Sequence, residues 1–327
     1  MRRFKRVGLW DETCVPCETQ RTLALTDGAR QKVSVNNRAV TNAMNSAMTP
    51  DSRLAAVEHF YDFHPISAQQ ILAAVASRGA TLEGLTEEVL QHHDQDHYGG
   101  TAAVDRLMAE ADVQAHDEVL DVCSGMGGPA RYLAWKTGCR VTGLDLTQSR
   151  VEGATELTRL AGLADRVRFV EGNALAMPFE SASFTLAIGQ EAYAHIPNKP
   201  MLVRECARVL RPGGRWVFSD ILKRQPLSDK DARRLFDGMR FSEIASVEEY
   251  TAWLQVNGLR LVRSVDLSQE WTRILRERHA MYRSLEAQTV ERLGREHFER
   301  YDNAYAHFVG LYQVGTLGGA LIHAVRD

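Results

Sequence analysis

The chain has 327 residues, of which 44% are hydrophobic and 25% charged, proportions that are ordinary for a globular protein. Its formal net charge of −3 offers no electrostatic attraction for nucleic acid or an anionic membrane, and no apolar run approaches the roughly 18 residues that span a bilayer. The chain begins with a segment rich in basic residues, Met1 to Arg6, but no apolar stretch follows it. We therefore expect no secretory signal and a cytoplasmic protein.

The chain contains five cysteines, an odd and small number that fits a reducing compartment better than a disulfide framework. Cys14 and Cys17 form a CxxC pair, a spacing that can bind zinc or act as a redox couple. The sequence offers neither a second ligand pair nor a thioredoxin-like strand and helix. We interpret the pair as accidental, within a polar extension over residues 1–48 that we expect to be poorly ordered. Cys123 and Cys206 are predicted as small core residues.

Short amphipathic helices are predicted after this extension. Thr49 to Ser52 is a typical helix start, and from Asp51 onward apolar residues recur at helical spacing. The pattern continues as helices over residues 67–76 and 85–92. We expect residues 49–98 to form a helical cap over a ligand site rather than an independent domain.

Strands and helices alternate through the centre of the chain, residues 99–225. Strands are predicted over residues 118–122, 140–146, 167–171, 184–188 and 215–219. Helices are predicted over residues 102–111, 129–137, 148–161 and 200–209. Strands joined by helices predict the α/β class, with a parallel sheet and helices on both of its faces.

The last third, residues 226–327, is rich in helices. The pattern predicts helices over 229–239 and 247–256, a strand over 259–266, long helices over about 271–312 and a closing strand over 319–325. We assign these helices to a lid over the substrate and the two strands to the same sheet as the centre.

The most informative stretch runs from Val119 to Gly128. A short apolar run predicts a buried strand, and a glycine-rich turn then leads into a helix, where a ligand can approach bare backbone. A second predicted strand ends at Asp145, about 20 residues further on, where a carboxylate can accept from the two hydroxyls of a ribose. The pattern therefore predicts a nucleoside-like cofactor.

These features resemble the class I S-adenosylmethionine-dependent methyltransferases, from about residue 98 to the end and most strongly over residues 118–221. The acid-and-glycine motif of that family reads Asp121-x-Cys123-x-Gly125-x-Gly127 here, with Cys123 in place of the usual first glycine. The resemblance implies a Rossmann-like sheet of seven strands, mostly parallel with an antiparallel last strand, a helical N-terminal cap and helical lid insertions.

The same resemblance implies S-adenosylmethionine as the cofactor. Asp145 matches the ribose-binding acid of the family, Gly172 to Ala174 match the segment that lies along the adenine, and Val209 to Gly214 match the turn before the fifth strand. Asn173 stands where the family more often has aspartate, and either side chain can accept from the adenine amino group. The residues implied at the cofactor are Tyr98, Gly100, Asp121, Ser124, Gly125, Gly127, Asp145, Leu146, Asn173, Ala174 and Gln190.

The segment after the fourth predicted strand, Ile188 to His195, is similar to that of the sarcosine/dimethylglycine and phosphoethanolamine N-methyltransferases. This resemblance implies N-methylation of a small polar amine, with Gln190, Glu191 and His195 as catalytic candidates at the carboxyl edge of the sheet. His195 would act as a base or orient the nucleophile, and the alternative is a histidine that packs the following loop. Tyr98 would cover the cofactor or, alternatively, pack a helix against the sheet.

Aromatic and basic residues near the C-terminus are candidates for contacts with the substrate. One helical face carries an aromatic stripe, which is typical of a core and would alternatively form a cage for a methylated ammonium; it comprises Tyr301, Tyr305, Phe308 and Tyr312. Further candidates for the lid or for a substrate carboxylate are Trp271, Tyr282, Arg273 and Arg276.

The methyl acceptor stays open on this basis. Methylation of carbon, oxygen or sulfur in a quinone, sterol or thio-acid fits the same fold, as does a cofactor-binding protein without turnover. Nucleic acid is disfavoured, because the chain has neither a basic stripe nor an Asn-Pro-Pro-Tyr-like motif for a flipped base. His92 to His97 resemble a metal site, but neighbouring helix positions point apart. We expect no metal, no membrane and a small-molecule partner, for either a monomer or a homodimer.

Overall fold

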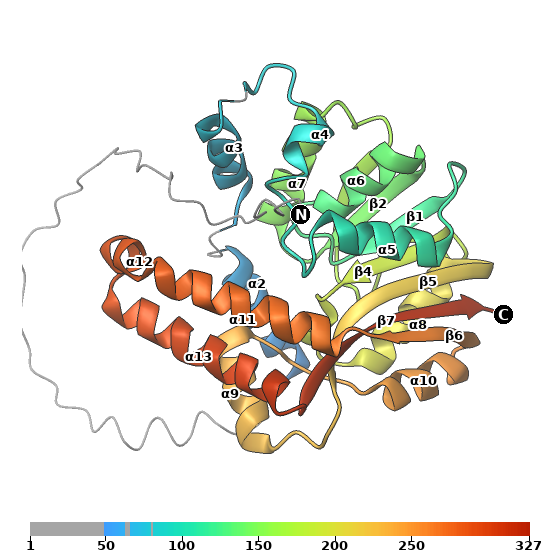
Figure 1. The fold of residues 1–327 in the computed structure, drawn as a ribbon. Coiled ribbons are helices and arrows are strands. Elements are labelled where there is room, and N and C mark those ends of the chain that lie inside the picture. The colour runs from blue at the N-terminus through green and yellow to red at the C-terminus, as the bar shows by residue number, and fades with distance from the viewer. Residues whose placement is uncertain (1–48, 63–65, 80) are drawn as a thin grey trace, which may run out of the picture.

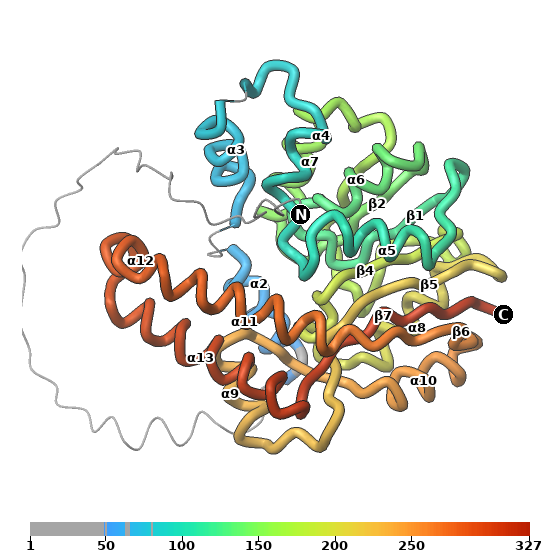
Figure 2. The backbone as a smooth tube through the Cα atoms, in the orientation of Figure 1, coloured from blue at the N-terminus to red at the C-terminus, as the bar shows by residue number. Residues whose placement is uncertain are grey.

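A sheet of seven strands crosses the computed structural model, which describes residues 49–62, 66–79 and 81–327 (Figures 1 and 2). The strands are β1 (Glu118–Val122), β2 (Arg140–Asp145), β3 (Val167–Glu171), β4 (Phe184–Gln190), β5 (Leu210–Lys223), β6 (Leu259–Asp266) and β7 (Leu317–Arg326). Their order across the sheet is β3-β2-β1-β4-β5-β7-β6. The predicted N-terminal extension, with Cys14 and Cys17, lies outside the described residues.

The central strands are apolar on both faces, because helices cover both sides of the sheet. In β1, Val119 packs into one hydrophobic cluster while Leu120 and Val122 pack into another. β1 pairs in parallel with β2 and β4, β2 with β3, and β4 with β5. β7 lies antiparallel between β5 and β6. The predicted sheet, mostly parallel with an antiparallel last strand, is confirmed.

Strand β5 is longer than the sequence pattern predicted at both of its ends. Before Arg215 its pairing with β4 is irregular, since Phe184 pairs with Leu210 and Leu186 with Arg215, so the Pro-Gly-Gly turn is a bulge inside the strand. At the other end, Lys223 still pairs with Leu317 of β7. Antiparallel pairing with a distant strand extends β5 beyond its own apolar run, a contribution that local sequence does not show.

The helices of the central region, together with the later helix α10, lie on both faces of the sheet (Figure 1). They are α5 (Thr101–Ala111), α6 (Gly128–Thr137), α7 (Gln148–Leu160), α8 (Lys199–Val209) and α10 (Val247–Val256). Leu107 of α5 and Leu133 of α6 join the cluster that holds Val119. Leu202 of α8 and Leu254 of α10 belong to the opposite cluster. The predicted helices of this region are confirmed to within a few residues.

Three N-terminal helices pack against this core beside α7. They are α2 (Pro50–Asp62), α3 (Ala68–Ser77) and α4 (Glu87–Leu90). Ile71 of α3, Leu90 of α4 and Leu157 of α7 share a third hydrophobic cluster. Arg150 of α7 donates to the carbonyl oxygens of Ile66 and Tyr61, at 2.6 and 3.1 Å. This one guanidinium therefore ties α2 and the start of α3 to the central region.

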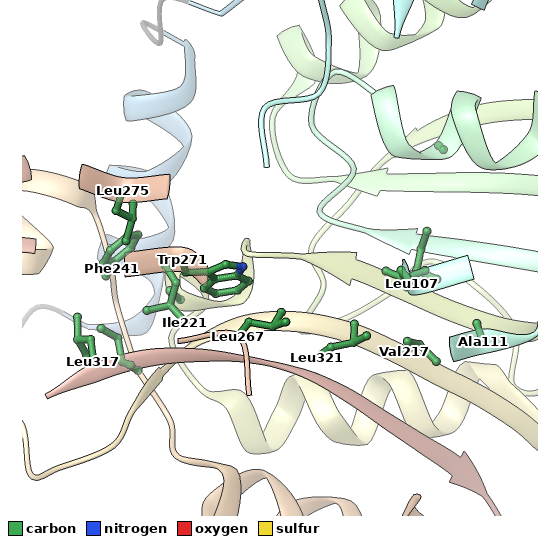
Figure 3. Close-up of a cluster of buried hydrophobic side chains, with 14 of the residues drawn as sticks. Leu107, Ala111, Val217, Ile221, Phe241, Leu267, Trp271, Leu275, Leu317 and Leu321 are labelled. Carbon is green, nitrogen blue, oxygen red and sulfur yellow. The ribbon is translucent and has the colours of Figure 1, made fainter. Parts of the chain in front are cut away.

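The C-terminal insertion comprises α9 (Asp229–Met239), α11 (Ser268–Ser284), α12 (Glu286–Leu293) and α13 (Arg295–Gln313). Figure 3 shows Trp271 and Leu275 of α11 among side chains of the sheet, including Ile221 and Leu321. An added Cβ at Gly319 would lie 2.1 Å from the Trp271 ring, so a glycine in β7 is required for this close approach. No helix within the described ranges is long and apolar enough to cross a membrane.

A cluster of buried charges fastens α4 and the residues after it to α6. Arg131 donates to Asp94 at 2.6 Å and lies 3.5 Å from Glu87, and all three side chains are fully buried. The same guanidinium donates to Thr158 of α7 and to the carbonyl oxygen of Met126. Neither carboxyl oxygen of Glu87 has a hydrogen-bond partner in the part of the chain that the structure describes.

Replacing Arg131 by methionine is expected to lower the free energy of unfolding by about 3–5 kcal/mol, because the buried carboxylate of Asp94 loses its counter-charge. The control is Arg159→Met, since Arg159 pairs with Glu156 at the surface, where their side chains are 63% and 46% exposed. Such a surface pair contributes less than about 1 kcal/mol. Urea unfolding followed by circular dichroism measures both, and equal small losses would contradict the anchoring role.

A second expectation concerns pH. Burial raises the pKa of Glu87 to about 9, so the folded protein holds a proton that the unfolded chain releases at neutral pH. This contribution to stability is complete at low pH and falls as the pH rises toward 9. Glu87→Gln needs no proton, so its free energy of unfolding should exceed that of the natural protein by ~1 kcal/mol or more at pH 8 and match it near pH 5. A difference that does not change with pH would contradict this.

Candidate active site

A cavity opens at the carboxyl ends of β1, β2 and β4, where residues that follow parallel strands meet at one edge. Helix α2 and the insertion helices α11 and α13 contribute the opposite wall. The residues predicted from sequence that line this cavity are Tyr98, Asp121, Ser124, Gly125, Asp145, Leu146, Asn173, Ala174, Gln190, Glu191 and His195. Gly100 and Gly127, also predicted at the cofactor, are not among the lining residues.

Gly127 is required by packing. An added Cβ would lie 2.3 Å from the ring of Phe169 and 2.8 Å from Nη1 of Arg131, so only glycine lets α6 approach the sheet so closely. Gly127 also has a φ of 78°, in the left-handed region. Gly100, with a φ of 58°, is the residue before α5 and redirects the chain into that helix.

Cys123 occupies the position where the family has its first glycine, and its backbone explains the family preference. Its φ of 64° is left-handed, a conformation that costs a residue with a Cβ about 1–2 kcal/mol. The predicted core position is confirmed for Cys206, which is buried, but Cys123 lines the cavity. Burial raises the pKa of the Cys123 thiol, so it stays protonated.

The carboxylate of Asp145 joins the end of β2 to the glycine turn. Its Oδ2 accepts from the backbone N–H of Gly125 at 2.8 Å, and its Oδ1 accepts from that of Thr147 at 3.0 Å. Burial is the largest influence on this carboxyl and raises its pKa, while both hydrogen bonds act in the opposite direction. On the neighbouring loop, Asn173 Oδ1 accepts from the N–H of Leu175 at 2.8 Å, which fixes the direction of that amide.

Three buried polar atoms of residues that line the cavity have no hydrogen-bond partner among the described residues. They are Oδ2 of Asp121, Oγ of Ser124 and Oε1 of Gln190, and all three residues line the cavity. Buried polar atoms are normally paired, so these three indicate a ligand with polar groups at this place. The set combines a carboxylate, a hydroxyl and an amide oxygen, which suits a ligand that carries both an ammonium and a carboxylate.

Glu191 has a strained backbone conformation, and both of its carboxyl oxygens accept hydrogen bonds. Its φ of 55° is left-handed. Its Oε2 accepts from the backbone N–H of Tyr98 at 2.5 Å, and its Oε1 accepts from the hydroxyl of Ser219 at 2.8 Å. Burial raises the pKa of Glu191 to about 7. The side chain therefore connects the segment before α5 to the end of β4 and to β5.

His195 forms a hydrogen-bonded pair with Tyr61 of α2, a residue that was not among the predicted site residues. Nδ1 of His195 lies 3.2 Å from the carbonyl oxygen of Arg240, an acceptor, so Nδ1 carries the proton of the neutral ring. Nε2 can then accept from the Tyr61 hydroxyl at 3.0 Å. The two residues are 134 positions apart in the chain, so no local pattern could have joined them.

The wall opposite the strands is largely apolar. Its apolar side chains include Leu54, Val57, Phe60, Ile196, Met239 and Phe241, and Ile221 of β5 adds an apolar group from the sheet. Phe241 lies edge-on to the ring of His195, with the ring centres 5.1 Å apart. This wall can accommodate a hydrocarbon ligand next to the Tyr61–His195 pair.

The predicted aromatic stripe divides between two roles. Tyr301 and Tyr305 line the cavity, whereas Phe308 and Tyr312 are buried in the core. Trp271 is also core and lies edge-on to Tyr98, with ring centres 5.1 Å apart.

Among the arginines of α11, Arg278 lines the cavity, whereas Arg273 and Arg276 do not. Arg273 forms an exposed pair with Glu277. Tyr282 of α11 stacks on Phe298 of α13. Arg278 donates to the carbonyl oxygens of Asp96 and His97, and its guanidinium lies 5.0 Å from the centre of the Tyr98 ring.

The histidine-rich segment His92 to His97 forms no metal cluster. Across residues 49–62, 66–79 and 81–327, no group of three or more candidate ligands is arranged to hold a metal ion. His97 instead hydrogen-bonds to Gln95 at 2.8 Å, and Asp94 pairs with Arg131.

Comparison with known proteins identifies relatives of this chain. The methyltransferase domain family matches residues 120–218. Methyltransferase GfsG of Streptomyces halstedii is 31% identical over 59% of this chain and 80% of its own length. The 27-O-demethylrifamycin SV methyltransferase of Amycolatopsis mediterranei is 34% identical over 53% of this chain and 66% of its length. The glycine/sarcosine/dimethylglycine N-methyltransferase of Actinopolyspora halophila is 26% identical over 68% of this chain and 39% of its own length.

Among solved structures, the [4+2]-cyclase SpnF superposes with a TM-score of 0.64 at 22% identity, over 83% of this chain and 95% of SpnF. A likeness at that identity concerns the fold, which by itself does not decide a reaction. The match to GfsG, together with the domain match over the glycine turn and the four strands β1 to β4, decides the family. The chain belongs to the class I S-adenosylmethionine-dependent methyltransferases.

Proposed function

We propose that this protein methylates a hydroxyl group of a largely apolar small molecule. The observation that carries the proposal is the Tyr61–His195 pair beside an apolar cavity wall. A hydroxyl must lose its proton as it attacks, and the imidazole of His195, which accepts from the Tyr61 hydroxyl, can take a proton up. The name of one relative, 27-O-demethylrifamycin SV methyltransferase, supports methylation at oxygen.

The cavity residues fit S-adenosylmethionine by their chemistry. A Cβ at Gly125 would meet no atom within 4 Å, so the turn leaves room for a ligand against its backbone. The carboxylate of Asp145 keeps lone pairs for the ribose hydroxyls. The unpaired Asp121 and Ser124 suit the ammonium and carboxylate of the amino-acid end. When bound, S-adenosylmethionine supplies an electrophilic methyl group on a sulfonium.

The protein's own task is to hold the acceptor and to remove its proton. Because Nδ1–H of His195 donates to Arg240, the lone pair on Nε2 is directed at Tyr61. Burial raises the pKa of Tyr61, so its hydroxyl is neutral before reaction. Tyr61 can pass its proton to Nε2 while its oxygen accepts the proton of the substrate hydroxyl, so the positive charge ends on the imidazole. The apolar wall keeps water from this path.

Methylation of an amine is the second candidate, and aromatic side chains favour it. Tyr98, Tyr301 and Tyr305 line the cavity near Asp96, a set that suits a methylated ammonium. The glycine/sarcosine/dimethylglycine N-methyltransferase among the relatives supports this class.

One experiment distinguishes the two candidates. The protein is incubated with methyl-labelled S-adenosylmethionine and with matched sets of hydrophobic alcohols and small polar amines. Mass spectrometry of the labelled products should find a methyl ether. Labelled N-methyl products alone would replace the first candidate by the second, and no transfer to any compound would favour a binding protein without turnover.

Asp145→Ala is expected to weaken S-adenosylhomocysteine binding by at least about tenfold, because the ribose hydroxyls lose a charged acceptor. Isothermal titration calorimetry measures this affinity. Asp165→Ala is the control, since the Asp165 side chain is 72% exposed. Unchanged affinity in Asp145→Ala would refute the ribose contact.

His195→Ala is expected to lower kcat by about 10²-fold or more while changing S-adenosylhomocysteine affinity less than about twofold, because the proton acceptor is lost and the cofactor contacts remain. Tyr61→Phe should also lower kcat. Tyr282→Phe is its control, as the Tyr282 hydroxyl has no partner among the described residues. Equal losses of kcat and cofactor affinity in His195→Ala would assign His195 to structure alone.

A further inference from the structure

We propose that a buried chain of hydrogen bonds, in which His97 is the central positioning residue, fixes the orientation of the Gln190 amide so that its oxygen accepts from the α-ammonium group of the cofactor. The inference rests on the family's cofactor and not on the methyl acceptor proposed above.

The chain begins at the ion pair of Arg131 and Asp94. Nη2 of Arg131 donates to Oδ2 of Asp94 at 2.6 Å. The other oxygen, Oδ1, lies 3.2 Å from Nε2 of Gln95. A carboxylate held by a guanidinium is an acceptor, so Gln95 must turn its NH₂ group toward Asp94. The carbonyl oxygen of the Gln95 amide therefore points the other way.

The orientation of the Gln95 amide determines which ring nitrogen of His97 carries the proton. Its Nε2 lies 2.8 Å from Oε1 of Gln95, and since an amide oxygen has no proton, Nε2 must carry one. Burial lowers the pKa of His97 to about 4, so at neutral pH the ring holds a single proton. Its Nδ1 is consequently a bare acceptor.

Gln190 is the end of the chain. Its Nε2 lies 3.3 Å from Nδ1 of His97, and Nδ1 can only accept, so Gln190 donates there. The amide oxygen is left facing away from His97, buried and without a partner in the described part of the chain. Turning the amide around would oppose two lone pairs, so His97 prevents this flip.

The place of this oxygen identifies its ligand. Asp121 is paired with Ile188 across β1 and β4, and Gln190 follows Ile188 by two residues, so both side chains reach the cavity at the same strand ends. Oδ2 of Asp121 is also unpaired. Two neighbouring acceptors suit a group with several N–H donors. Asp145 and Asn173, the expected partners of ribose and adenine, follow β2 and β3, which leaves the amino-acid end for Gln190.

The test compares two ligands that differ in that amino-acid end. S-adenosylhomocysteine carries the ammonium, and 5′-methylthioadenosine lacks it. By calorimetry, His97→Leu should weaken binding of S-adenosylhomocysteine about tenfold and change that of 5′-methylthioadenosine less than about twofold. Adding Gln190→Glu to His97→Leu should restore most of the affinity, because a carboxylate presents oxygen in either orientation. His323→Leu is the control, since this histidine pairs with Glu110 and does not line the cavity.

Equal weakening of both ligands by His97→Leu, without recovery in the double variant, would make His97 merely structural and overturn the proposal. Unchanged affinity for S-adenosylhomocysteine would also overturn it. If His97→Leu does not fold, as judged by circular dichroism, Gln190→Leu and Gln190→Glu decide: only the leucine variant should lose S-adenosylhomocysteine affinity selectively. These measurements need no methyl acceptor, so failure of the hydroxyl proposal leaves them unaffected.

Discussion

The hydrogen bond from the N–H of Gly125 to the carboxylate of Asp145 is the constraint on which the site depends. Parallel pairing of β1 with β2 sets Val122 opposite Leu144, so the residues after both strands emerge side by side. The carboxylate holds the glycine turn with one oxygen and Thr147 with the other. The floor of the cavity therefore has a fixed shape before any ligand binds, which lowers the cost of ordering it.

Buried charge extends this constraint from the turn to the N-terminal segment. Arg131 stands on the helix that the turn begins, and it binds Asp94 and contacts Glu87. A buried ion cluster is costly unless each group is compensated. Here the same contacts set the course of the residues that lead to His97 and Tyr98, whose N–H meets Glu191. Stability of the fold and geometry of the site are thus coupled through one guanidinium.

Elements outside the central sheet supply the cavity wall that we assign to the acceptor. Tyr61 comes from α2, Tyr301 and Tyr305 from α13, and Phe241 from the loop after α9. The [4+2]-cyclase SpnF has the same fold, which is consistent with a shared core that serves different reactions through different covers. In this chain the core carries the cofactor chemistry, and we assign the choice of acceptor to α2 and the C-terminal insertion.

Local patterns were sufficient for the strands and helices of the centre, and the glycine turn with Asp145 predicted a nucleoside-like ligand, because both depend on residues close in sequence. Local patterns did not predict three features of the site. These are the Tyr61–His195 pair, the position of Arg278 in place of Arg273, and the hydrogen-bond chain from Asp94 through His97 to Gln190. Each of these joins segments that are far apart in the sequence. Periodicity reports which face of an element is buried, whereas only packing decides which distant side chain meets it there and in which orientation.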